Sequence, residues 1–184
     1  MVLPGPVMGK ILNRSRPGTM GPARPPMRYD VAVSESDAPG DSAETANSSR
    51  ILEGPNYVIR VENGYVYTHV FRRPDVSLDS GARFAGTFAD ELTELATAAP
   101  EEHAYCVINL IDAPSISGPR TRVEMSRLVA AWEKAGRPVV VVVGEEPIKD
   151  VQYHGLLHDH ARKFGRIART DEQAHAIARK LLRR

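Results

Sequence analysis

The chain has few of the features that mark secreted and membrane proteins. Cys106 is its only cysteine, so an intrachain disulfide is impossible and nothing points to an oxidising compartment. The longest purely aliphatic run, residues 139–143, is far shorter than the ~20 apolar residues that span a bilayer. The first dozen residues do not show the basic segment followed by an apolar one that is typical of a secretory signal.

An excess of charge of either sign is also missing. The 184 residues include 24 basic and 23 acidic side chains, so no broad positive field draws the chain onto nucleic acid or an anionic membrane. We therefore expect a cytoplasmic protein with neither a nucleic-acid partner nor a membrane partner. A hydrophobic content of 42% suits one globular domain of common size, with some chain left over.

The N-terminal part differs in composition from the rest. Residues 1–50 hold half of the 14 prolines and one aromatic residue, Tyr29, and they show no hydrophobic periodicity. Their charges form a basic block followed by an acidic one: Lys10, Arg14, Arg16, Arg24 and Arg28, then Asp30, Glu35, Asp37, Asp41 and Glu44. Such a segment buries too little apolar surface to offset the entropy of ordering it, so we expect residues 1–54 to form a disordered tail. Three interpretations of this segment stay open: a basic arm that contacts a partner, a solvated tail, or a true translation start at Met20 or Met27.

A β-hairpin is expected at the start of the folded part, residues 55–184. Residues 57–61 and 65–71 are rich in β-branched and aromatic side chains, and Asn63-Gly64 lies between them. An Asn-Gly pair supplies the positive φ angles that a tight hairpin requires. Pro74 then ends the second strand.

Helices and strands alternate after the hairpin. Strands are expected at residues 105–111, 139–143 and 166–169. Four helices are expected: one capped at Asp79 or Ser80, one ending at Gly136, one over residues 150–163, and one starting in a capping box at Thr170. Their apolar stripes are Phe84, Phe88, Leu92 and Leu95; Met125, Leu128, Val129 and Trp132; Tyr153, Leu157, Ala161 and Phe164; and Ala174, Ile177, Ala178 and Leu181. The order β-β-α-β-α-β-α-β-α predicts an α/β fold with a mixed, mostly parallel sheet opened by a hairpin.

The common nucleotide-binding motifs are missing. No expected strand is followed by the glycine pattern of a dinucleotide-binding loop or of a P-loop. Asp112 follows a strand, as the phosphoacceptor of a receiver domain does. However, no acidic pair follows the first strand, and Gly144 stands where a hydroxyl residue would be needed. We expect no cofactor.

Catalytic and metal-binding arrangements have equally little support. His154 and His158 lie one helical turn apart, a spacing that zinc can use, but His160 points about 200° away from His158 around the helix. We expect a polar helix face there and no metal. Ser115 has no nucleophile elbow around it, and Cys106 lies inside a strand that should be buried. We therefore expect that the chain is not an enzyme.

The order of elements and one segment resemble the STAS family (sulfate transporter and anti-sigma factor antagonist). The segment is residues 107–118, Val-Ile-Asn-Leu-Ile-Asp-Ala-Pro-Ser-Ile-Ser-Gly. It looks like the family's aliphatic strand followed by a loop that ends in isoleucine, aspartate and a phosphorylatable serine. The valines of residues 139–143 resemble the family's next strand, and the likeness covers about residues 57–184. When Ile116 is aligned with the family isoleucine, Ser117 replaces the aspartate and Gly118 replaces the serine. Either Ser117 or Ser115 takes the place of the serine after a shift of one or a few residues, or the domain has lost the switch and acts as a constitutive binding or scaffold module.

The resemblance implies a bacterial signalling module that binds a protein partner, such as an anti-sigma factor, a kinase or a scaffold. The partner would bind the loop and helix after the central strand. The candidate partner-binding residues are Ser115, Ser117, Gly118, Arg120, Thr121 and Arg122, and Ser117 is the candidate phosphorylation site. Two alternatives stay open: a STAS relative that binds a nucleotide or a small lipid, and an unrecognised enzyme. The sequence leaves the oligomeric state undetermined.

Overall fold

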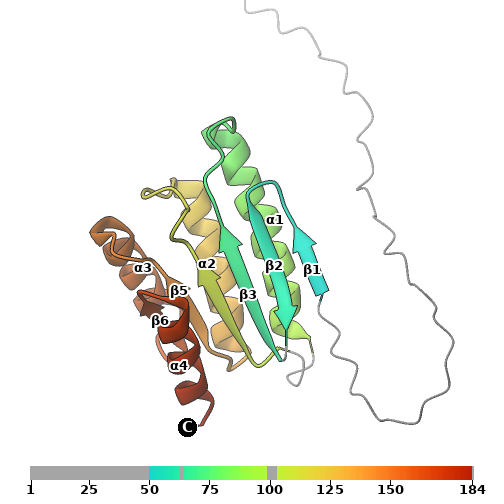
Figure 1. Ribbon diagram of the computed structural model, residues 1–184, viewed down its shortest axis with the longest axis vertical. Helices are drawn as coiled ribbons and strands as arrows, with labels where there is room; N and C mark the ends of the chain where they lie inside the picture. Colours follow the sequence, from blue (N-terminus) through green and yellow to red (C-terminus); the bar gives the residue numbers. More distant parts are fainter. Residues whose placement is uncertain (1–49, 63, 99–102, 184) are drawn as a thin grey trace, which may run out of the picture. The chain divides into compact units, whose positions relative to one another are not determined.

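A computed structural model describes residues 50–62, 64–98 and 103–183, all within the compact unit Glu44–Arg184 (Figure 1). The strands are β1 (Arg50–Glu53), β2 (Tyr57–Glu62), β3 (Tyr65–Val70), β4 (Tyr105–Asn109), β5 (Val139–Val142) and β6 (Gly165–Ala168). The helices are α1 (Leu78–Thr97), α2 (Pro119–Lys134), α3 (Pro147–His160) and α4 (Asp171–Leu182). No helix among these described residues is long and apolar enough to cross a membrane.

The six strands form one mixed sheet in the order β1-β2-β3-β4-β5-β6. β1, β2 and β3 pair antiparallel, and β3 to β6 pair parallel. Gly64, at the turn between β2 and β3, has a φ of 80°, the left-handed conformation that the expected hairpin requires. The prediction of an α/β fold with a mixed sheet opened by a hairpin is confirmed.

β1 is a strand that the sequence analysis placed in the disordered tail. Its residues pair with β2, with Leu52 opposite Ile59, and Leu52 packs against the core. The assignment of residues 50–53 to the tail was therefore wrong, and the observed order of elements gains a strand at its start. A run of four residues is too short to show a hydrophobic periodicity of its own. Its conformation depends on the strand with which it pairs. The rest of the expected tail, residues 1–49, lies outside the described residues.

The sheet has different helices on its two faces. Ile59, Val66, Cys106, Ile108 and Val141 belong to the larger core cluster, which includes the buried stripes of α1, α2 and α3. The alternate strand residues, such as Val107 and Val140, pack with Ala174 and Ala178 of α4. Three successive crossovers of the same hand, each advancing by one strand, place their helices on the same face. In Figure 1, α1 and α2 lie behind the strands and α4 lies in front.

The helix ends agree with the expectations at two places and differ at two. Thr170 caps α4 through a hydrogen bond from the Gln173 N–H, and Gly136 follows α2 with a φ of 70°. α1 is capped by Ser77, not by Asp79 or Ser80. α3 covers 147–160 instead of 150–163, because Pro147 is well suited to the first helical position.

Candidate functional site

The β4–α2 loop, residues 110–118, leaves β4 where the parallel strands end. Chain direction places the starts of α2 and α3 at this same edge of the sheet, the edge at which α/β proteins usually carry their functional groups. All six predicted binding residues lie on this loop or in the first turn of α2. Ser115, Gly118, Arg120 and Arg122 are exposed, whereas Ser117 and Thr121 are half-buried.

The first turn of α2 has an unusual charge distribution for a helix start. Gly118 is the N-cap, so no side chain accepts a hydrogen bond from the first backbone N–H groups. Pro119 occupies the first position, and no acidic residue lies in the first turn. Arg120 and Arg122 add positive charge to the positive end of the helix dipole. An incoming carboxylate or phosphate would therefore be stabilised at this helix start.

Ser117 is held against α3. Its hydroxyl lies 3.2 Å from the Tyr153 hydroxyl, and its backbone N–H donates to Gln152 Oε1 at 3.3 Å. Gln152 also donates to the Ser115 carbonyl oxygen at 3.2 Å. Burial raises the pKa of Tyr153, which therefore stays a neutral hydrogen-bonding partner at ordinary pH. These contacts connect the loop to α3 across more than thirty residues of sequence.

Lys149 is a buried cation that sequence reasoning missed. Its side chain is 1% exposed, and Nζ donates to the carbonyl oxygens of Leu110 and Ile111 at 2.8 and 2.7 Å. Nζ also lies 2.9 Å from Glu146 Oε1, and hydrogen bonds from Ser115 and then Lys149 lower the pKa of Glu146. Lys149 therefore fixes the first residues of the loop to α3. The sequence did contain a signal for the burial of Lys149. Lys149 lies four residues before Tyr153, so both residues lie on the same buried stripe of α3.

A second polar group lies on the α4 face of the sheet. Asp171 accepts hydrogen bonds from Tyr67 at 2.9 Å and from Asn109 at 2.9 Å, and Asn109 Oδ1 accepts the Ile111 N–H at 3.0 Å. Burial, followed by the hydrogen bond to Asp171, raises the pKa of Tyr67 to about 12. This cluster orients the end of β4 and the start of the loop from the face opposite Lys149.

His69 of β3 and Asp112 of the loop form a hydrogen bond, which the sequence did not reveal. His69 Nε2 and Asp112 Oδ2 lie 2.8 Å apart, and both side chains are exposed. The Asp112 carbonyl oxygen also accepts the Arg72 N–H at 2.8 Å. Asp112, for which the sequence analysis rejected a phosphoacceptor role, therefore joins the loop to the segment after β3.

Exposed aliphatic side chains also lie on the loop and in the first two turns of α2 and α3. Ile116 of the loop is 70% exposed, Val123 in the second turn of α2 is 66% exposed, and Val151 in the second turn of α3 is 74% exposed. Ile111 and Ile148 are also exposed. We call these five residues, together with the six predicted binding residues, the loop surface. Exposed aliphatic residues gathered at one edge of a domain are typical of protein-binding surfaces.

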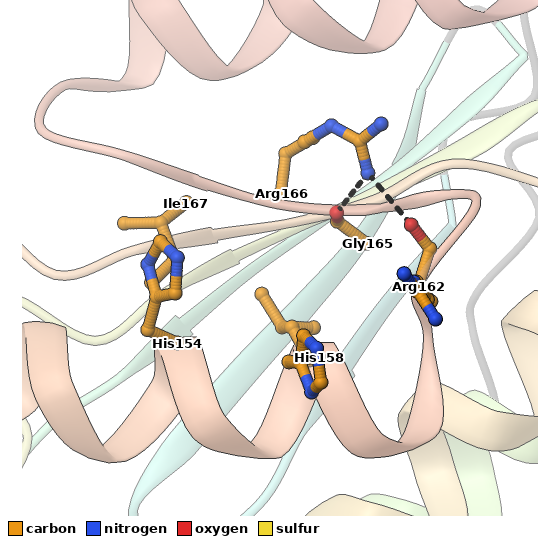
Figure 2. Close-up of a pocket in the computed structure, with 7 residues that line it drawn as sticks. His154, His158, Arg162, Gly165, Arg166 and Ile167 are labelled. Atoms are coloured by element: carbon orange, nitrogen blue, oxygen red, sulfur yellow. Dashed lines mark hydrogen bonds between the residues drawn. The ribbon is translucent and has the colours of Figure 1, made fainter.

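The α3 histidines border a different hollow, next to β6 (Figure 2). It has a volume of about 240 Å³, and His154 and His158 line it together with Arg162 and Arg166. Two of these basic groups have partners: Arg166 donates to the carbonyl oxygens of Arg162 and Gly165, and His158 lies 3.1 Å from Asp159. In the described part of the chain, no group of three or more His, Cys, Asp or Glu side chains is arranged to hold a metal ion.

Cys106 lies in the larger core cluster. Its side chain is fully buried within β4, and this burial raises the pKa of the thiol. The environment is that of an unreactive structural cysteine, as we expected from the sequence.

The comparisons with known proteins identify no relative: no family model, no curated protein and no solved structure matches this chain. The resemblance to the STAS family therefore depends on residues 107–118, on the valines of residues 139–143 and on the order of the elements.

Proposed function

We propose that this chain is a non-catalytic signalling module of the STAS type, resembling an anti-sigma factor antagonist. It binds a protein partner through the loop surface. The observation that carries the proposal is the combination of exposed aliphatic side chains with a helix start that lacks a side-chain cap, on a loop anchored from below by Lys149. A rigid, partly apolar surface limits the entropy lost on association.

The partner's chemistry follows from the two parts of the loop surface. Ile116, Val123 and Val151 suit an apolar patch on the partner, since burial of such side chains supplies most of the binding free energy. The start of α2, with Arg120 and Arg122, suits an acidic side chain or a phosphate at the border of that patch. A protein partner with carboxylates next to aliphatic residues satisfies both parts.

Phosphorylation of Ser117 would act as an off-switch in this proposal. Gly118 stands at the position of the family serine, so Ser117 is the nearest hydroxyl in sequence. A phosphate on Ser117 would disrupt its contact with Tyr153 and would occupy the positive helix start in place of the partner's acidic group. Ser117→Asp is therefore expected to weaken partner binding.

The proposal is tested by photocrosslinking in a lysate of the source cells. A photoreactive amino acid at Val123 should give a discrete crosslinked protein, whereas the same group at Leu182, exposed on α4, should not. Arg120→Glu with Arg122→Glu should reduce the crosslink at Val123 at least fivefold. Acidic residues suit the first turn of a helix, so this variant should fold normally.

The control for charge is Arg179→Glu with Lys180→Glu, the same reversal on exposed positions of α4. It should leave the crosslink at Val123 unchanged. Equal crosslinks at Val123 and Leu182, or no effect of the α2 reversal, would contradict the proposal. A thermal shift with nucleotides, in the absence of any crosslinked protein, would favour the nucleotide-binding alternative.

A further inference from the structure

An apolar cavity of about 130 Å³ lies beneath the β4–α2 loop, between α1 and α2. Phe88, Leu110 and Met125 form buried parts of its wall, and Phe84 and Ile116 contribute further apolar surface. Figure 1 shows α1 and α2 side by side on the same face of the sheet. The cavity is partly open to solvent, so a small molecule can enter it without unfolding of the domain.

Two glycines leave this cavity open. Gly81 is the fourth residue of α1 and lines the cavity, and a Cβ added there would meet no atom within 4 Å. The same is true of Gly118. Glycine inside a helix lowers helix stability relative to other residues because its backbone loses more freedom. A larger residue at Gly81 would stabilise α1 and reduce the cavity, yet the chain has glycine there.

The wall also carries polar groups. The hydroxyl groups of Ser117 and Tyr153, two residues that line the cavity, lie 3.2 Å apart. One hydrogen bond between two hydroxyl groups leaves one donor and several acceptor lone pairs of the pair for a further partner.

We infer that this cavity binds a compact apolar molecule that carries one hydroxyl group. An apolar cavity of roughly 150 Å³ accommodates one benzene ring, so a single ring or a branched chain of similar size is the matching ligand. Its hydroxyl forms a hydrogen bond with the Ser117–Tyr153 hydroxyl pair. The inference goes beyond the proposed function, because it concerns a small molecule and stands whether or not the loop surface binds a protein.

Cyclohexanol is the probe, and the full chain is titrated with it while amide resonances are followed by NMR. The Ser117 and Gly118 amides should shift in a saturable way, with a dissociation constant on the order of 1 mM, as suits a ligand of this size. Gly81→Leu places a side chain in the cavity and should weaken binding at least tenfold. It should also remain folded, because leucine is a better helix former than glycine.

The matched control is Gly155→Leu, on the exposed surface of α3, where an added Cβ also meets no atom within 4 Å. This variant should bind cyclohexanol as the original chain does. Shifts that do not saturate, or an equal loss of binding in both variants, would overturn the inference. Saturable binding of decanoate without binding of cyclohexanol would overturn the ligand class, since it would show a site for a long acyl chain.

Discussion

At the scale of single residues, Lys149 determines how the loop surface is supported. A lysine that is almost completely buried needs partners for its three N–H groups, and the Leu110, Ile111 and Glu146 oxygens supply them. The carbonyl oxygens of residues 110 and 111 lie just beyond the end of β4. The Leu110 oxygen also accepts the Ala113 N–H at 3.1 Å, so Lys149 is its second donor.

Lys149→Met should strongly destabilise the protein. Methionine fits the space but leaves two carbonyl oxygens without this donor, so the free energy of unfolding should fall by about 3 kcal/mol. Urea unfolding measures the change. The control is Lys163→Met, at an exposed position, which should change the value by less than about 0.5 kcal/mol. Equal effects of the two variants would refute the supporting role of Lys149.

Cys106 provides a second test at the residue scale. Burial raises the pKa of its thiol, so at pH 8 the thiolate that reacts with disulfide reagents is nearly absent in the folded chain. The native protein should not react with a thiol reagent over minutes, and one thiol per chain should react at once in 8 M urea. Rapid reaction in the native state would show that the larger core cluster opens readily.

At the scale of elements, the start of α2 combines a glycine cap with two arginines in its first turns. Neither feature favours helix stability, because both the cap acceptor and the acidic side chains of an ordinary helix start are missing. A binding surface often retains such locally unfavourable features. The helix stays formed because its stripe, Met125, Leu128, Val129 and Trp132, is buried in the core.

Gly118→Asp should therefore stabilise the chain while weakening partner binding. An aspartate cap accepts the orphan N–H groups and interacts favourably with the helix dipole, worth about 0.5–1 kcal/mol in thermal unfolding. It also occupies the place proposed for the partner's acidic group. Gly118→Ala adds a Cβ without a hydrogen-bond acceptor and serves as the control. We expect little gain in thermal stability from this variant. A loss of stability in Gly118→Asp would show that the helix start already has a partner.

At the scale of the whole molecule, β1 completes the edge of the sheet. Its four residues pair with β2, and Leu52 covers part of the core that would otherwise meet water. A chain that begins at residue 50 should be more stable than one that begins at residue 55 by about 1–3 kcal/mol, roughly the value of one buried leucine. Urea unfolding of the two truncated chains provides the comparison. Equal stability would restore the domain boundary that the sequence predicted.

The fold class and the apolar stripes of α1, α2 and α4 were predictable from the sequence, because they depend on residues within one or two turns of each other. The stripe predicted for α3 was wrong in part, since Ala161 and Phe164 lie beyond the helix and Leu156 is buried. Gly64 shows this for the hairpin, and Thr170 shows it for the start of α4. The place of the candidate site was also predictable, since the loop after a central parallel strand always lies at the carboxyl edge of the sheet.

Only the tertiary structure decided how that loop is held and what lies beneath it. Ser117 contacts Tyr153 and Lys149 contacts Leu110 across more than thirty residues, and no local pattern encodes such a pair. The conformation of β1 depends on the edge that β2 offers, and the open cavity depends on how α1 packs against α2. Local periodicity specifies which faces become buried, but the identity of the groups that meet there follows from strand order and helix packing.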